Sequence, residues 1–110
     1  MGHHFINVKD ARSLEELISR SQERPVVIFK HSNTCPVSAA AYEQMTQFDG
    51  EVALVDVQSA RAVSREIEEK TGVAHESPQV LILRDGKVIW NASHWRVKAE
   101  AVEDAIRNKS

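Results

Sequence analysis

Apolar residues recur along this chain with two different periods, and their succession predicts strands and helices in turn. Short continuous apolar runs bounded by polar residues or proline are typical of strands covered on both faces. Apolar residues spaced three and four apart indicate helices with one buried face. The predicted strands are residues 5–8, 26–29, 52–57, 79–84 and 88–93. The predicted helices are one that starts at Ser13 and ends before Arg24-Pro25, and residues 36–48, 60–71 and 98–108.

Local start and stop signals agree with these elements. Ser13 is followed three residues later by Glu16, which is a capping-box pattern for the first helix. Gly72 is a typical helix end. Asp85-Gly86 predicts a two-residue hairpin that pairs the last two strands antiparallel. Residues 30–34 are predicted to be a loop between the central strand and the second helix.

The order of elements predicts an α/β fold. Strands alternating with helices give three parallel strands joined by right-handed crossovers, and the hairpin adds an antiparallel edge to the sheet. About four helices flank this mixed sheet, and 110 residues have room for one domain, 1–110. The arrangement resembles the thioredoxin fold.

Charge and hydropathy narrow the class of partner. The net charge is −2 with both signs scattered, so the chain has no basic face for nucleic acid or for an anionic membrane. Its apolar runs are far too short to span a bilayer, and the N-terminus lacks the layout of a secretory signal. We therefore expect a cytoplasmic protein, and we expect it to be monomeric.

The single cysteine, Cys35, is the candidate for chemistry. One cysteine excludes an internal disulfide and a CxxC motif, which leaves an inert buried thiol or a reactive one. Its neighbours are polar residues and proline, and it follows the carboxyl end of the strand at 26–29. Sites in open α/β sheets lie beyond such strand ends. This context favours a reactive thiol.

A helix that begins at this point would stabilise the thiolate, which is the nucleophilic form of cysteine. The first turn of a helix has unpaired N–H groups and the positive end of the helix dipole. Pro36 suits the first helical position, because proline lacks an N–H that would be unpaired there anyway. Thr34 is a candidate N-cap whose hydroxyl could bind a backbone N–H or the sulfur.

Three neighbouring residues complete the candidate site, each with an alternative interpretation. Lys30 and His31 would lower the pKa of the thiol if the loop brings them close; otherwise they are solvated loop residues. Ser38, three residues after Cys35 and separated from it by Pro36 and Val37, stands where a dithiol oxidoreductase has its resolving cysteine. A mixed disulfide on Cys35 must then be resolved by a second molecule, unless Ser38 is only a polar residue on the helix surface.

Ser77-Pro78, directly before a buried strand, resembles the cis-proline element of thioredoxin-fold proteins. The resemblance implies that these two residues face the active-site cysteine and offer backbone groups to an extended substrate. A plain strand-entry proline is the alternative, since few X–Pro bonds in folded proteins are cis. The sequence leaves the isomer open.

Taken together, the segments Lys30-His31-Ser32, Thr34-Cys35-Pro36-Val37-Ser38, Ser77-Pro78-Gln79 and His94-Trp95 resemble the monothiol bacilliredoxin family over nearly the whole chain. The resemblance implies that Cys35 removes bacillithiol from bacillithiolated client proteins and is regenerated by a second low-molecular-weight thiol. Bacillithiol would be the co-substrate, with no bound cofactor and no metal. His94, Trp95 and Arg96 could contribute to a thiol pocket but have no assigned role, and Trp95 could equally pack at the end of the sheet.

Three other functions remain open. A glutathione-type monothiol glutaredoxin usually carries a Gly-Gly pair after the cis-proline strand, whereas residues 84–87 here read Arg-Asp-Gly-Lys. An iron–sulfur carrier would share a cluster across a dimer, but Pro36 and Val37 replace the small pair that such proteins use. The third alternative is a non-catalytic adaptor. The five histidines show no spacing typical of a metal site.

Overall fold

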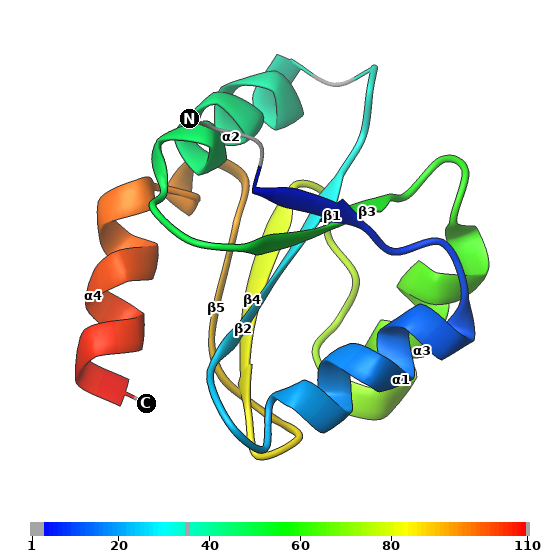
Figure 1. The fold of residues 1–110 in the computed structure, drawn as a ribbon. Helices are drawn as coiled ribbons and strands as arrows, with labels where there is room; N and C mark the ends of the chain where they lie inside the picture. The colour runs from blue at the N-terminus through cyan, green and yellow to red at the C-terminus, as the bar shows by residue number, and fades with distance from the viewer. Residues whose placement is uncertain (1–3, 35, 110) are drawn as a thin grey trace.

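A five-stranded sheet lies between two pairs of helices in the computed structural model, which describes residues 4–34 and 36–109 (Figure 1). The strands are β1 (Phe5–Asn7), β2 (Val26–His31), β3 (Val52–Asp56), β4 (Gln79–Arg84) and β5 (Lys87–Ser93). The helices are α1 (Ala11–Arg20), α2 (Pro36–Gln47), α3 (Arg61–Thr71), α4 (Ala99–Lys109) and a short 3₁₀ helix, η1 (His94–Arg96). No helix in the described part of the chain is both long and apolar enough to cross a membrane.

The strand order is β1-β3-β2-β4-β5, with β2 at the centre of the sheet. β1, β3 and β2 are parallel, and β4 and β5 run antiparallel to their neighbours. Ile28 in β2, for example, pairs with Ala53 of β3 and Leu81 of β4. The predicted mixed sheet and its four flanking helices are confirmed, and most predicted boundaries lie within one or two residues of those observed.

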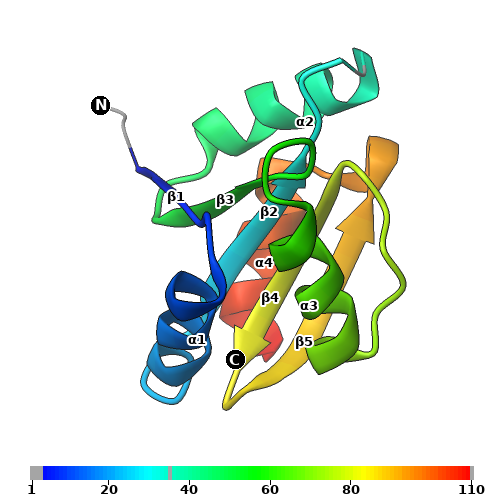
Figure 2. The ribbon, with the colours of Figure 1, turned by 90° about the vertical axis from the view of Figure 1, so that its right-hand side faces the viewer.

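Side chains on the two faces of the sheet form two separate cores. Ile28 points to the α1 and α3 side, where it packs in a cluster with Leu14 and Ile67, and Phe29 points to the α2 and α4 side, where it packs with Met45 and Val102. Figure 2 shows the helices on either side of the strands. Because both faces of β2 are covered, its apolar run is continuous rather than alternating.

Helix α1 starts earlier than predicted. Its N-cap is Asp10, whose carboxylate accepts a hydrogen bond from the Ser13 backbone N–H at 2.9 Å. The prediction that Ser13 caps this helix is therefore wrong. Asp caps a helix as well as Ser does, and in this position it satisfies the N–H of the residue that had been expected to be the cap.

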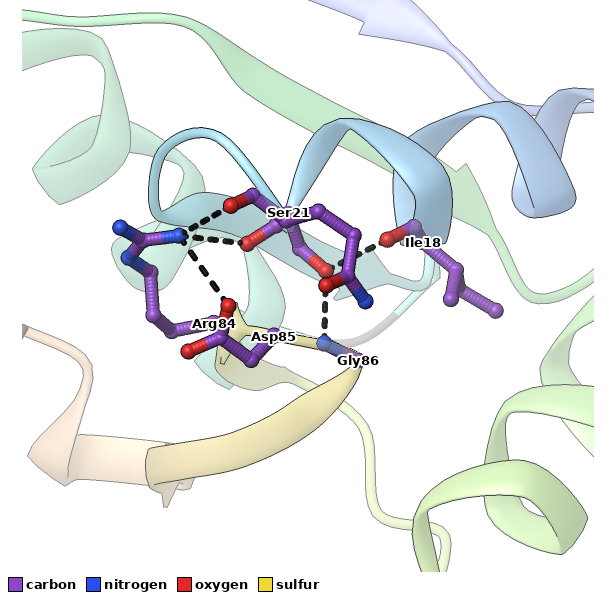
Figure 3. Close-up of polar contacts among 6 residues, drawn as sticks. Ile18, Ser21, Arg84, Asp85 and Gly86 are labelled. Atoms are coloured by element: carbon purple, nitrogen blue, oxygen red, sulfur yellow. Dashed lines mark hydrogen bonds and ion pairs between the residues drawn. The ribbon is translucent and has the colours of Figure 1, made fainter.

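The β4–β5 hairpin is fastened to the end of α1 (Figure 3). Asp85 and Gly86 both have positive φ, 57° and 76°, as a two-residue type I′ turn requires. The Arg84 guanidinium donates to the carbonyls of Ser21 and Gln22 at 3.0 and 2.8 Å, and the Gly86 N–H donates to the buried Ser21 hydroxyl at 2.9 Å. This fastening lies at the amino end of β2, at the opposite end of that strand from the start of α2.

We expect Ser21→Ala to destabilise the fold. The substitution removes the hydroxyl that accepts from the half-buried Gly86 N–H, and losing such a hydrogen bond costs about 0.5–1.5 kcal/mol. The free energy of unfolding, measured in urea, should fall by about that amount. Ser19→Ala, at an exposed position of the same helix, should change it by less than about 0.5 kcal/mol. Equal midpoints for the wild type and Ser21→Ala would contradict the assignment.

Candidate functional site

The carboxyl end of β2 leads directly to the start of α2. The strand ends at His31 and the helix begins at Pro36, so Pro36 is the first helical residue, as predicted. Cys35, on which the predicted chemistry depends, lies outside the described residues. The site is therefore described from the elements around that position.

The Ser77-Pro78 peptide bond, which the sequence left open, is cis. Pro78 is buried, and its carbonyl accepts a hydrogen bond from the His94 N–H at 2.9 Å. The next residue, Gln79, pairs with Lys30 of β2. The cis-proline segment consequently lies beside the carboxyl end of β2, next to the strand end from which the chain passes into α2.

Lys30 and His31 belong to β2 and not to a loop, which corrects the predicted loop at 30–34. Lys30 pairs with Val55 on one side and Gln79 on the other, and His31 pairs with Asp56. Pairing on both edges extends the strand beyond its apolar run, an effect that local sequence does not reveal. Lys30 is completely buried, so its interpretation as a solvated loop residue is wrong.

One amide side chain connects Lys30 to the cis-proline segment. Gln79 Oε1 accepts hydrogen bonds from Lys30 Nζ at 2.9 Å and from the Glu76 N–H at 3.4 Å, while Nε2 donates to the Ala74 carbonyl at 3.1 Å. Gln79 was predicted only as part of a family segment. The one signal that could have identified it is a glutamine at the first position of an otherwise apolar strand.

The connection 32–34 is held by Asp56, the last residue of β3, and by Gln58, which follows the strand. The Asn33 N–H donates to Gln58 Oε1 at 2.9 Å, and its side-chain amide donates to Asp56 Oδ2 at 3.3 Å. The Gln58 N–H in turn donates to Asp56 Oδ1 at 3.0 Å. Sequence reasoning missed Asp56 and Gln58, although the carboxyl ends of neighbouring parallel strands necessarily meet at one edge of the sheet.

The structure gives the polar contacts of Thr34 and Ser38. The Thr34 hydroxyl lies 3.4 Å from both Ser32 Oγ and Gln58 Nε2, and its role as the N-cap stays a prediction because residue 35 lies outside the described residues. Ser38 is fully buried, and its hydroxyl accepts a hydrogen bond from the Ser32 N–H at 3.3 Å. The surface interpretation of Ser38 is therefore wrong. Val37, between Pro36 and Ser38, is half-buried.

His94, Trp95 and Arg96 form η1, which the sequence did not predict. His94 Nδ1 lies 3.1 Å from a carboxylate oxygen of Glu76, so this residue contacts the cis-proline segment through both its backbone and its ring. Trp95 is 63% exposed, which excludes the interpretation that it packs at the end of the sheet. Among residues 4–34 and 36–109, no three His, Cys, Asp or Glu side chains gather as metal ligands would.

Comparison with known proteins decides the family. The family model described as monothiol bacilliredoxin BrxC matches residues 6–102. The chain belongs to the monothiol bacilliredoxin family. Its members are thioredoxin-fold oxidoreductases with thiol-based partners.

Solved structures confirm the fold of this bacilliredoxin-family chain. A provisionally assigned oxidoreductase with a thioredoxin fold is 33% identical, with a TM-score of 0.85 and 93% of each chain covered. A reduced thioredoxin pre-protein of Schistosoma mansoni is 18% identical, with a TM-score of 0.70 over 98% of this chain and 100% of the other. A thioredoxin from Halobacterium salinarum is 17% identical, with a TM-score of 0.72 over 96% and 90%. The two thioredoxins show similarity of fold alone.

Burial determines the charge of the two basic residues of this family member's β2. Desolvation lowers the pKa of Lys30 from 10.5 to about 8, although Glu68 and Glu76 act in the opposite direction. Lys30 is thus mainly a buried cation at pH 7. Desolvation also lowers the pKa of His31, against the opposing effect of Asp56, so its ring is mostly neutral at pH 7. The positive charge at this strand end comes from Lys30.

The lowered pKa of Lys30 makes stability depend on pH. Between pH 8 and 10.5 the unfolded chain binds a proton at this residue that the folded chain has released, so the free energy of unfolding rises with pH across that window. We expect Lys30→Met to remove this rise. Urea unfolding of both proteins at pH 7, 8, 9 and 10 should show the wild type gaining stability relative to the variant as pH increases. Parallel curves would contradict the assignment.

Proposed function

We propose that this protein is a monothiol oxidoreductase that removes bacillithiol from mixed disulfides of cytoplasmic client proteins, with Cys35 as its nucleophile. The observation that carries the proposal is the family match over residues 6–102 in a chain with one cysteine, which directly precedes α2. The cis Ser77-Pro78 segment beside the end of β2 supports it, because extended substrates need backbone partners close to the reacting sulfur.

The reaction consists of two thiol–disulfide exchanges. The Cys35 thiolate attacks the bacillithiol sulfur of the client disulfide, a new S–S bond forms, and the client leaves as a thiolate that takes up a proton. The thiolate of a second bacillithiol then attacks the bacillithiol sulfur bound to Cys35. Bacillithiol disulfide leaves and the Cys35 thiolate is restored. In total, the mixed disulfide and one free bacillithiol are converted to the client thiol and bacillithiol disulfide, so one disulfide bond is present before and after the cycle.

Two features of the described residues support an ionised thiol at position 35. Helix α2 has 12 residues, and the positive end of a helix dipole stabilises an anion by about 0.3–1 kcal/mol, or up to about 2 kcal/mol in partly buried sites. One pKa unit corresponds to about 1.4 kcal/mol, so the dipole alone lowers a thiol pKa by about 0.2–0.7 units at exposed sites and by up to about 1.4 units at partly buried ones. The buried Lys30 cation adds to the positive potential at the same end of the sheet.

The residues on either side fit a monothiol cycle. Ser38 provides no resolving thiol, and its hydroxyl is used as an acceptor for the Ser32 N–H. The Ser77 hydroxyl oxygen is buried and has no hydrogen-bond partner among the described side chains and backbone. A buried polar atom without a partner in the free protein is suited to bind a substrate group. We assign it to the backbone of the client next to the mixed disulfide.

The family match supports bacillithiol as the thiol. No Gly-Gly pair follows β4 in the sequence, which departs from the pattern that glutaredoxins usually carry. The turn that follows β4, Asp85-Gly86, is held at the end of α1 and lies at the opposite end of β2 from the start of α2, so it does not contact a thiol bound at Cys35. We therefore name bacillithiol as the co-substrate because of the family, and the two exchanges require no bound cofactor.

Intact-mass spectrometry tests the proposed function. After exposure to bacillithiol disulfide we expect one adduct per chain, located at Cys35, and a slower or absent adduct with glutathione disulfide. Cys35→Ser should form neither. Preferential glutathionylation would instead indicate a glutaredoxin-type enzyme, and the absence of both adducts would contradict the proposal.

A client assay tests the direction of the reaction. A bacillithiolated client protein mixed with the reduced enzyme should release its thiol, and the bacillithiol mass should appear on Cys35. Free bacillithiol should then clear that mass and make release catalytic. Cys35→Ala should abolish release. If the variant captures clients as well as the wild type does, the protein acts as an adaptor rather than as an enzyme.

A further inference from the structure

A polar cleft lies on the β3 side of β2, on the side away from the cis-proline segment. It has a volume of about 460 Å³ and is lined mainly by His31, Asn33, Ala39, Tyr42, Asp56 and Asn7, which together define the Asp56 cleft. Three of its elements surround position 35 in the chain: the end of β2, the connection 32–34, and the first turns of α2. β1 and β3, side by side in Figure 1, provide the rest.

A second hollow of about 420 Å³ adjoins the Asp56 cleft. The two share Asn7, Leu54 and Asp56, and the second reaches Lys9 and Ser59. We call the two adjoining hollows the trough: they lie at the carboxyl ends of β1 and β3, and the first reaches the start of α2 while the second reaches Lys9. A ligand attached near position 35 could extend along it.

The residues that line the Asp56 cleft indicate a ligand that carries hydroxyl groups. The Asp56 carboxylate binds two described donors, the Gln58 N–H and the Asn33 amide, and a carboxylate has about four acceptor sites. It therefore keeps capacity for hydroxyl donors from a ligand. The His31 and Tyr42 rings, with centroids 5.1 Å apart, add an aromatic wall, and Asn7 adds an amide. A few fixed polar groups on an aromatic and aliphatic wall are typical of small-molecule sites.

The charges around the Asp56 cleft further restrict which ligand can bind. None of the described residues that line the Asp56 cleft is a lysine or an arginine, and the His31 ring is mostly neutral at pH 7. A carboxylate beside Asp56 would be repelled. Lys9, at the far end of the trough, is exposed and can pair with an anionic group there. The trough thus matches a body rich in hydroxyl groups that ends in a carboxylate.

We propose that the Asp56 cleft binds the non-reacting body of the low-molecular-weight thiol while its sulfur is bound to Cys35. This inference rests on the proposed function. In both exchanges the same bacillithiol sulfur is attacked, first by Cys35 and then by the second thiol. The three sulfurs of such an exchange lie close to one line, so the departing client and the incoming thiol use the same side. The body of the bound thiol remains in place throughout, and it needs a site of its own.

Two adjacent alanines of α2 provide a matched test. Ala39 is exposed and lines the cleft, whereas Ala40 is on the other flank of the helix. We expect Ala39→Leu to slow adduct formation from bacillithiol disulfide at least about tenfold, equivalent to about 1.4 kcal/mol. With cystine, which has no such body, the rate should change by less than about twofold. Ala40→Leu should leave both rates within about twofold, because both changes keep helix propensity high.

Lys9→Gln tests whether the positive charge at the Lys9 end of the trough binds an anionic group of the ligand. This change should lower the rate with bacillithiol disulfide, leave the rate with cystine unchanged, and lose its effect in 1 M salt, where exposed charges are screened. Lys87→Gln, an exposed lysine in the hairpin at the far end of β4, is the control and should alter neither rate.

Amide chemical shifts of the bacillithiol-loaded protein provide the second measurement. Shifts at Asn7, Asn33 and Asp56 are expected relative to the reduced protein. Shifts confined to Gln79 and His94 would place the body on the cis-proline side and overturn the inference, as would an equal loss of rate with both disulfides in Ala39→Leu. If the wild-type protein forms no bacillithiol adduct, the proposed function itself is overturned. If it forms the adduct but reacts equally fast with bacillithiol disulfide and with cystine, only the assignment of the Asp56 cleft is overturned.

Discussion

The pairing of β2 on both of its edges is the constraint on which the candidate site depends. β2 runs parallel to β3 and antiparallel to β4, so the carboxyl ends of β2 and β3 lie beside the amino end of β4 at one end of the sheet. This end of the sheet brings together the start of α2, the cis-proline segment and Asp56, which come from three distant parts of the chain. Each of them is placed by backbone register, and the opposite end of β2 is fixed independently by the Ser21 and Arg84 contacts.

The burial of Lys30 at this end of the sheet costs free energy. Removing an ammonium from water is unfavourable by several kcal/mol unless it is paired, and Lys30 has one hydrogen-bond partner among the described residues, the neutral Gln79 amide. Two carboxylates, Glu68 and Glu76, offset part of the cost from a distance. The ammonium donates to Gln79, which holds the segment before the cis-proline, whereas an aliphatic residue at this position would continue the apolar run of β2 and make no such bond. The retention of Lys30 is consistent with a need for positive potential where a thiolate must form.

Sequence reasoning predicted the fold well because hydrophobic period, turn chemistry and chain order all indicated the same topology. The Asp85-Gly86 turn and the Gly72 helix end are local signals, and both elements appear where they were predicted. The candidate site was harder to predict from the sequence than the fold was. Lys30 and His31 looked like loop residues because their strand character comes from partners at 55, 56 and 79. A surface position for Ser38 was left open as an alternative, because a serine gives no indication of which face of a helix will be covered.

Residues that act across the sheet could not be read from their neighbours in the chain. Asp56 is the last residue of β3 and Gln58 follows the strand, more than 20 residues after position 35, and only the parallel register brings them to the 32–34 connection. The same register separates two flanks of β2, with the Asp56 cleft on the β3 side and the cis-proline segment on the β4 side. In the proposed monothiol cycle one thiol stays bound while two others are exchanged. The two sides of β2 offer separate surfaces for these tasks, with the Asp56 cleft beside β3 and the cis-proline segment beside β4.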